Sequence, residues 1–412
     1  MKLSRIGRLS MALVVSVAMG LGMTACGGGT IGYMWVLGTQ YNQIAGFKID
    51  DFSGNLTNIV GSPFSSGGTN PVSVVVKPGG RYIYVVNAGT STTAGNIAEF
   101  SVGGDGILTF QAAFTSQGGT PVWEALDSSG NFLYVLDRVA PSFSACNPVG
   151  SPCGDITVFS IASDTGRLSL VPNAQLLNTN GTQLTYFPVG TEPIMTKSTG
   201  GCLMTVNSAD NTVFPYTTNG STGQLTLPTG VTKQPTGATK LTSINTSGSY
   251  VYLTDAGATT ANPGGLILPY TVGSNCALNT LTGGPVPNLP LTQNPTYSFT
   301  DARNRYLYVL NQSTTNTTNA NSTISAFTID QTNGKLQPIG DANNPYPIGS
   351  GPVCMVEDPT NQYVYTSNRV DGSVTGKIIN QNTGQLSSLN RGSTFAATGL
   401  ATCLVVSGNV SN

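Results

Sequence analysis

The sequence of 412 residues contains no histidine, and this absence limits the chemistry that its side chains can perform. It excludes imidazole general bases, Ser–His–Asp triads and histidine metal sites. A transition-metal site would then need cysteine thiolates, but no C-x-x-C pair occurs among the seven cysteines. An Asp/Asn-rich loop at Asp341–Asn344 could hold calcium, although the pattern is unspecific. Carboxylates and guanidinium groups are therefore the candidate catalytic groups, and we predict no cofactor and no metal.

Charged residues make up only 8% of the chain, so an acidic residue inside an apolar segment is informative. Glu124 lies in "PVWEAL", directly after Trp123, and Glu357 ends "PVCMVE". Such carboxylates could form structural ion pairs or end a strand in solvent, and we favour this interpretation over a catalytic one. The net charge of −1 gives no reason to expect nucleic acid as a partner.

Six cysteines besides Cys26 are an even number, which suits disulfides in an exported protein. We expect Cys146 to pair with Cys153 in one long loop. Of the other four, Cys354 and Cys403 lie on inner strands of neighbouring blades, and Cys202 and Cys276 in adjacent blades, in the repeat described next. These two further pairs are the ones we expect.

A repeated strand pattern shows which elements must position these residues. "GRYIYVVN" (Gly80–Asn87) returns as "GNFLYVLD" (Gly130–Asp137), "GSYVYLTD" (Gly248–Asp255), "NRYLYVLN" (Asn304–Asn311) and "NQYVYTSN" (Asn361–Asn368). Each copy follows an apolar strand that often begins with Pro, and precedes a third strand and a Gly-x-Leu turn that opens a fourth. Four strands repeated about every 50 residues are typical of a propeller blade.

The second strands number seven, at Tyr33–Gly38, Tyr82–Asn87, Phe132–Asp137, Cys202–Asn207, Tyr250–Asp255, Tyr306–Asn311 and Tyr363–Asn368. The first unit lacks its inner strand, and one spare strand, Leu400–Val406, follows the last unit. We therefore predict an all-β fold, a seven-bladed β-propeller of four-stranded antiparallel blades. The C-terminal strand would join the N-terminal blade and close the ring, whereas an open solenoid would leave two exposed edges.

Most of these second strands end in Asn or Asp at one register, namely Asn87, Asp137, Asn207, Asp255, Asn311 and Asn368. Recurrence in nearly every blade favours a structural role, in which the side chain caps the strand end by a hydrogen bond to the backbone.

The repeat resembles the seven-bladed propeller family of 6-phosphogluconolactonases and carboxymuconate-cyclising enzymes. The segment most similar to the family's motif is "YVYTSNRVDGSVTGKIINQNTGQL" (Tyr363–Leu386), and "YVLDR" (Tyr134–Arg138) is a second, shorter match. The resemblance covers about residues 33–407. The family's fullest motif has a histidine two residues after the arginine, where this chain has Asp371.

This resemblance implies a metal-independent lactonase site at one mouth of the central channel, built from arginine and acidic residues. Arg138 and Arg369 follow second strands and would stabilise the developing oxyanion, while a carboxylate would activate water. The candidate catalytic residues are Glu124, Arg138, Glu192, Glu357 and Arg369.

The N-terminal segment has the features of a lipoprotein leader. A cationic stretch precedes the apolar run Met11–Met23, which is short for a membrane span. "MTAC" (Met23–Cys26) resembles a lipobox, and a plain signal peptide with a chance cysteine is the alternative. We expect a signal peptide at 1–25, lipidation at Cys26, a tether at 26–32, one propeller domain at 33–407 and a tail at 408–412.

Two functions remain open at this stage. One is a binding or scaffold module of the cell envelope, using loops such as Asn311–Thr323 to contact a small molecule, a carbohydrate or a protein. The other is a hydrolase that opens a sugar or aromatic lactone. We expect a monomer attached to a membrane only by its lipid, on the outer membrane, the periplasmic face or the cell surface. The missing histidine favours the binding module.

Overall fold

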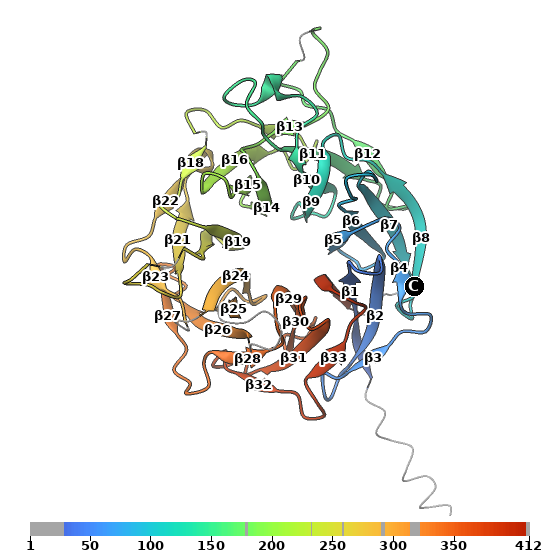
Figure 1. The fold of residues 1–412 in the computed structure, drawn as a ribbon, viewed down its shortest axis with the longest axis vertical. Coiled ribbons are helices and arrows are strands. Elements are labelled where there is room, and N and C mark those ends of the chain that lie inside the picture. Colours follow the sequence, from blue (N-terminus) through green and yellow to red (C-terminus); the bar gives the residue numbers. More distant parts are fainter. Residues whose placement is uncertain are drawn as a thin grey trace, which may run out of the picture.

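Seven antiparallel sheets stand around a central axis in the computed structural model (Figure 1). The structure describes residues 29–177, 180–231, 233–257, 259–289, 293–313 and 322–408. The fold is therefore an all-β, seven-bladed propeller, as the repeat predicted. We number the blades 1 to 7 by the order of their second strands along the chain.

Each blade begins with an inner strand beside the axis, followed by a second and a third strand. The inner strands of blades 1 to 7 are β34 (Ala401–Gly408), β5 (Pro71–Val76), β9 (Gly119–Leu126), β14 (Pro193–Thr199), β19 (Leu241–Ser247), β24 (Gln293–Thr300) and β29 (Pro352–Glu357). The second strands are β1 (Thr30–Gly38), β6 (Tyr82–Asn87), β10 (Phe132–Val139), β15 (Cys202–Asn207), β20 (Tyr250–Asp255), β25 (Tyr306–Ser313) and β30 (Tyr363–Asn368). The third strands are β2 (Gln43–Asp50), β7 (Asn96–Val102), β11 (Asp155–Ile161), β16 (Thr212–Thr218), β21 (Leu266–Val272), β26 (Ser322–Ile329) and β31 (Ser373–Ile379).

The outermost strand differs from the four-stranded expectation, because it is broken into two short pieces in six of the seven sheets. Only β8 (Leu108–Phe114) of blade 2 is continuous. The broken outer strands are β3 (Leu56–Asn58) with β4 (Phe64–Ser65), β12 (Leu168–Leu170) with β13 (Phe187–Pro188), β17 (Leu225–Thr226) with β18 (Gln234–Pro235), β22 (Leu278–Thr280) with β23 (Val286–Pro287), β27 (Leu336–Pro338) with β28 (Tyr346–Ile348), and β32 (Leu386–Ser388) with β33 (Thr394–Ala396). These strands cover the rim, where few residues are buried, so their weak sequence pattern is expected.

The second strands are almost completely buried, because neighbouring blades cover both of their faces. All six residues of β30 and of β15 are buried. Strands buried on both faces read as nearly continuous apolar runs, which explains the shared Tyr-x-Tyr-Val pattern.

An aromatic side chain of the second strand ties each of five blades to the next one. Its polar atom donates a hydrogen bond to the carbonyl of a turn glycine in the following blade: Trp35 to Gly106, Tyr84 to Gly166, Tyr252 to Gly334, Tyr308 to Gly384 and Tyr365 to Gly54. The second strand and the Gly-x-Leu turn are thus the two halves of one contact between blades.

The ring is closed by the two ends of the described chain. Strand β34 pairs antiparallel with β1, from Gly32 opposite Gly408 to Gly38 opposite Ala401. On its other side β34 packs against β29, and a disulfide joins Cys354 to Cys403 there. The spare C-terminal strand therefore completes blade 1, as expected from the missing inner strand.

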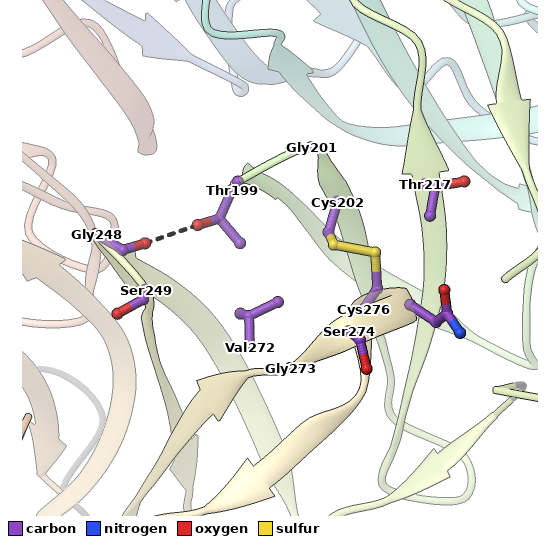
Figure 2. A pocket seen from close by; sticks show the side chains of 12 residues that line it. Thr199, Gly201, Cys202, Thr217, Gly248, Ser249, Val272, Gly273, Ser274 and Cys276 are labelled. Atoms are coloured by element: carbon purple, nitrogen blue, oxygen red, sulfur yellow. Dashed lines mark hydrogen bonds between the residues drawn. A yellow bond between two sulfur atoms is a disulfide. The ribbon is translucent and has the colours of Figure 1, made fainter.

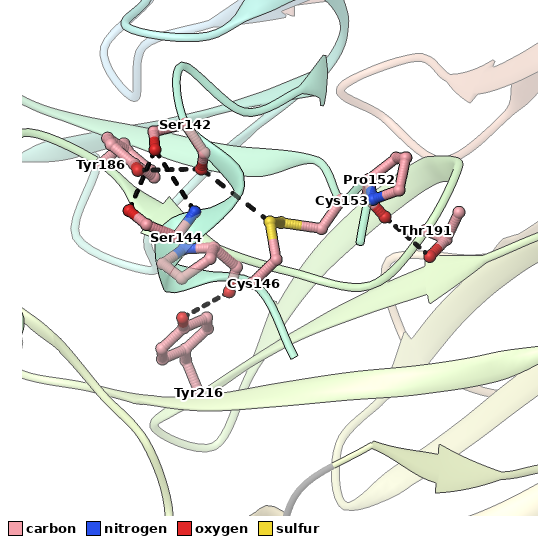
Figure 3. The surroundings of a disulfide bond; sticks show 9 residues. Ser142, Ser144, Cys146, Pro152, Cys153, Tyr186, Thr191 and Tyr216 are labelled. Atoms are coloured by element: carbon pink, nitrogen blue, oxygen red, sulfur yellow. Dashed lines mark hydrogen bonds between the residues drawn. A yellow bond between two sulfur atoms is a disulfide. The ribbon is translucent and has the colours of Figure 1, made fainter. Parts of the chain in front are cut away.

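The other two expected disulfides are also present. Cys146 and Cys153 close a loop of blade 3 that contains the short 3-10 helix η1 (Phe143–Ala145), and Tyr186 donates a hydrogen bond to Ser142 O beside it (Figure 3). Cys202 and Cys276, the latter at the end of the 3-10 helix η2 (Ser274–Cys276), join blades 4 and 5. Three disulfides are typical of a protein that resides outside the reducing cytosol.

Within the described ranges, no helix is long and apolar enough to cross a membrane. The predicted signal peptide and Cys26 lie outside the described residues.

Candidate functional site

The inner strands run in the same direction around the axis, so the channel has two distinct mouths. We call the mouth where the inner strands begin the proximal mouth, and the mouth where they end the distal mouth. The antiparallel second strands end at the proximal mouth, as the pairing of Pro352 with Asn368 shows. Residues that follow a second strand therefore gather at the proximal mouth.

Three of the five candidate catalytic residues lie at the proximal mouth, but on separate blades. Arg138 and Arg369 follow the core of the second strands of blades 3 and 7, and Glu192 directly precedes the inner strand of blade 4. All three are exposed. Blades 3 and 7 are not neighbours in the ring, and no ion pair joins any of these residues within the described ranges. The charged side chains at this mouth therefore form no ion pairs with one another.

Asp371, at the position of the family histidine, has a structural role. Its carboxylate accepts hydrogen bonds from Ser350 N at 2.7 Å and from Ser373 Oγ at 2.7 Å. These bonds fix the loop before β29 to the start of β31, so Asp371 is already engaged as an acceptor.

The recurring Asn and Asp residues at the strand ends also have the structural role that the sequence suggested. Asn87 Nδ2 donates to Ser66 O in the preceding loop and to Asn96 Oδ1 on the next strand. Asp255 accepts hydrogen bonds from the backbone N–H groups of Thr239 and Lys240. Asn87, Asp255 and Asn311 thus join a strand end to the loop that enters their own blade, whereas Asn207 and Asn368 donate to hydroxyl groups of the third strand.

Blade 3 carries an unusual variant of this arrangement, because two carboxyl groups face each other there. Asp137 lies opposite Asp155 across β10 and β11, and both are fully buried. Ser116 Oγ donates to Asp137 at 2.6 Å, whereas neither carboxyl oxygen of Asp155 has a partner among the described residues. Burial raises the pKa of Asp137 to about 7, and burial together with the charge of Asp137 raises the pKa of Asp155 well above its ordinary value. The pair therefore retains a proton at neutral pH.

The channel itself contains a cavity of about 400 Å³, to which all seven inner strands contribute. Most of its lining residues come from the second half of their strands, so it lies nearer the distal mouth. Its walls are mainly apolar, and they include Trp123, Tyr297, Phe299 and Met355. The rings of Trp123 and Tyr297, from blades 3 and 6, are 6.4 Å apart between centroids. Because these blades are not adjacent, the two rings meet across the channel.

Glu124 is the one candidate catalytic residue that lines this cavity. Its side chain is only 2% exposed, and neither carboxyl oxygen has a hydrogen-bond partner among the described residues. Burial raises the pKa of Glu124 well above its ordinary value, and the nearby backbone N–H of Val86 offsets only part of this effect. Burial therefore favours the neutral form of Glu124 over the carboxylate.

Lys197 on β14 is a second polar group in the cavity, and the sequence reasoning missed it. Its side chain is partly exposed to the channel, and desolvation by the surrounding protein lowers its pKa. Within the described ranges its ammonium group has neither an ion pair nor a hydrogen bond. The available signal was a lysine inside an inner strand, "PIMTKST" (Pro193–Thr199), in a chain with few charges.

Glu357 lies at the opposite mouth of the channel from the two candidate arginines. It ends β29 at the distal mouth, and its carboxylate accepts a hydrogen bond from Ala302 N at 2.8 Å. Burial raises the pKa of Glu357 to about 7. The five candidates therefore occupy three levels: the proximal mouth, the channel wall and the distal mouth.

A further pocket, between blades 4 and 5, has a different character (Figure 2). It has a volume of about 420 Å³, and its lining consists of the Cys202–Cys276 disulfide, glycines, Val272 and hydroxyl or amide residues. Thr199 Oγ1 donates to Gly248 O across it. It contains no charged side chain, so it offers no acid, base or cation. In the part of the chain that the structure describes, no three His, Cys, Asp or Glu side chains are grouped to hold a metal.

Comparisons with known proteins agree with this architecture. Residues 34–135 and 256–402 match the family described as "Lactonase, 7-bladed beta-propeller". A periplasmic gluconolactonase from Pseudomonas aeruginosa superposes with a TM-score of 0.68 at 16% identity, covering 92% of this chain and 100% of that one. A Bacteroides fragilis protein for which 6-phosphogluconolactonase activity is proposed gives 0.65 at 16% identity, covering 91% and 98%. A Lactobacillus plantarum protein gives 0.65 at 18% identity, covering 92% and 99%. No curated protein matches the chain significantly.

Proposed function

Because the chain belongs to the seven-bladed β-propeller lactonase family, we propose that it is an exported, lipid-anchored propeller that binds a ligand or partner in the cell envelope without hydrolysing lactones. The observation that carries this proposal is the separation of its candidate catalytic groups. Lactone hydrolysis needs a base and an oxyanion donor within hydrogen-bonding reach of one substrate. Here the arginines, Glu124 and Glu357 lie at three different levels of the ring.

The chemistry of the individual groups supports the same conclusion. Both carboxyl oxygens of Glu124 are buried, and burial raises its pKa, so it is poorly placed to activate a water molecule for attack on a lactone. Asp371 is committed to holding a loop, and the chain has no imidazole. An enzyme would have to assemble its site without any of these groups.

A second candidate function is the hydrolase, and one observation favours it. Arg138 and Glu192 lie on adjacent blades at the proximal mouth, and Arg369 keeps the family's position after a second strand. A sugar or aromatic lactone bound at this mouth could meet a guanidinium group and a carboxylate.

Turnover measurements on a panel of γ- and δ-lactones separate the two functions. We expect the purified mature protein to show no hydrolysis above the spontaneous rate. The variants Arg369→Ala and Glu124→Gln, with the surface variant Arg391→Ala as a control, should then be indistinguishable from the parent. A clear parent rate that falls a hundredfold or more in Arg369→Ala, with an unchanged fold, would establish the enzyme instead.

The lipid anchor is a separate part of the proposal and rests on the lipobox-like "MTAC". Two or three acyl chains would hold the protein at a membrane surface without a spanning segment. We expect Cys26→Ser to move the protein into the soluble envelope fraction, or to leave its signal peptide uncleaved. Identical membrane fractionation of parent and variant would contradict the anchor.

A further inference from the structure

The channel cavity has the size and wall chemistry of a small-molecule site. Its volume of about 400 Å³ lies within the range of ligand pockets. Trp123, Tyr297, Phe299, Met355 and several valines supply apolar and aromatic surface. A planar or compact apolar body of a few carbon atoms would fit such walls.

The cavity contains one basic side chain, Lys197, besides a few hydroxyl groups. Lys197 brings one positive charge into this apolar chamber, and no carboxylate of the described residues pairs with it. Burial disfavours this charge, and an anion beside the ammonium group would restore it. The cavity therefore holds one cationic group that no anionic group of the described residues balances.

Glu124 does not balance this cation. Both of its carboxyl oxygens are buried and hydrogen-bond to no described residue, and burial raises its pKa, which favours the neutral form. Its carboxyl group therefore neither pairs with Lys197 nor presents an accessible oxygen to a ligand in the cavity. The ligand that complements the cavity thus carries one anionic group and an apolar body.

We propose that the channel cavity binds a small aromatic monocarboxylate, with its carboxylate directed to Lys197 and its ring against Trp123 and Tyr297. This inference rests on the proposed binding function and names its site and ligand class. The site is distinct from the proximal mouth, where Arg138, Glu192 and Arg369 lie.

The experiment uses the mature protein, with benzoate and phenylacetate as probes and benzamide as the neutral isostere of benzoate. Isothermal titration calorimetry measures affinity, and tryptophan fluorescence reports on the cavity. Trp123 lines the cavity, while the other tryptophan, Trp35, is fully buried in blade 1 and gives a constant background. We expect saturable binding of a carboxylate with a change in fluorescence, and at least tenfold weaker binding of benzamide.

Two cavity variants and one surface control test the assigned contacts. Lys197→Met keeps the length of the side chain but removes the charge, and it should weaken carboxylate binding at least tenfold while leaving benzamide binding unchanged. Glu124→Gln keeps the shape of a buried side chain that offers the ligand no accessible oxygen, and it should leave carboxylate affinity unchanged. Lys335→Met, in an exposed turn, should bind like the parent. Circular dichroism and thermal unfolding of each variant verify the fold.

Equal carboxylate affinity in the parent and in Lys197→Met would overturn the proposal, as would the absence of binding at millimolar probe concentration. Should Lys197→Met not fold, Val356→Phe, which places a larger side chain on the cavity wall, must abolish binding. Lactone turnover is measured on the same preparations. Turnover without carboxylate binding would refute both proposals, whereas turnover with binding lost in Lys197→Met would refute only the non-catalytic function.

Discussion

At the residue scale, the most unusual feature is a set of buried or partly buried carboxyl groups that have no cation beside them. Asp137, Asp155, Glu124 and Glu357 all have a raised pKa, and burial is the main cause for each. None of them takes part in an ion pair among the described residues. Each of these groups therefore has a higher pKa in the folded state than in the unfolded chain.

This arrangement predicts a stability that falls as pH rises. An aspartate ionises near pH 4 in the unfolded chain but near pH 7 at Asp137 in the folded state. Between these values the folded state binds more protons, so the free energy of unfolding decreases with pH. One such group accounts for about 2–3 kcal/mol between pH 5 and pH 7. The contribution of this carboxyl group to the free energy of unfolding is fully present below pH 4 and is lost as pH rises through 7.

Asp137→Asn tests this directly, because it restores the amide that blades 2, 4, 6 and 7 carry at the same register. The amide would donate to Asp155 and remove one buried acid. We expect the variant to be more stable than the parent at pH 8 and to show a smaller loss between pH 5 and pH 8, measured by urea unfolding. An exposed control, Asp330→Asn, should shift stability equally at both pH values. An unchanged pH slope in Asp137→Asn would count against the shared proton.

At the element scale, the contact between blades depends on an aromatic donor and a turn glycine. Gly384 has a φ of +73°, a conformation that favours glycine, and a Cβ there would lie 2.4 Å from a ring carbon of Tyr306. Tyr308 Oη donates to Gly384 O at 3.0 Å, and both Tyr306 and Tyr308 are buried. The turn therefore needs glycine both for its backbone and for the ring that packs on it.

Tyr308→Phe removes this hydrogen bond while keeping the ring. The carbonyl of Gly384 would lose its buried donor, so we expect the free energy of unfolding to fall by about 1–3 kcal/mol. Tyr41, which is 58% exposed, provides the matched control, and Tyr41→Phe should change stability by less than about 0.5 kcal/mol. Chemical unfolding followed by circular dichroism measures both. Equal stability of the two variants would mean that the contact between blades stabilises by packing alone.

At the scale of the whole molecule, the ring depends on one strand that arrives last along the chain. Strand β34 contacts β1, β5 and β29, so it links blade 1 to both of its neighbours. Without it, β1 and β29 would both lose a neighbour, and the propeller would become an open array with exposed edges.

Deletion of residues 400–412 should therefore abolish cooperative unfolding of the entire domain, as recorded by scanning calorimetry. The double variant Cys354→Ser/Cys403→Ser is the milder comparison. It keeps the strand and removes a bridge between residues 49 apart, at a cost of up to about 4 kcal/mol by the chain-entropy relation. An unchanged thermal midpoint after the deletion would refute closure by the C-terminal strand.

The sequence by itself determined the propeller, its seven blades, the closing strand and the three disulfide pairs. These features follow from local patterns: a strand motif repeated at a fixed register, a missing inner strand and an even number of cysteines. The strand-end residues were also interpretable, because their recurrence in nearly every blade indicated a structural role.

Only the tertiary structure decided which polar groups share a space. Glu124, Lys197 and Tyr297 belong to blades 3, 4 and 6, and no sequence spacing reveals that their strands line one cavity. The opposition of Asp137 and Asp155, 18 residues apart, depends on the register of β10 with β11. The separation of Glu357 from Arg369 follows from strand direction, since an inner strand ends where its antiparallel neighbour begins. Repetition along a chain specifies each blade, but the environment of a charge is set by closure of the ring, which brings distant inner strands around one axis and removes water from between them.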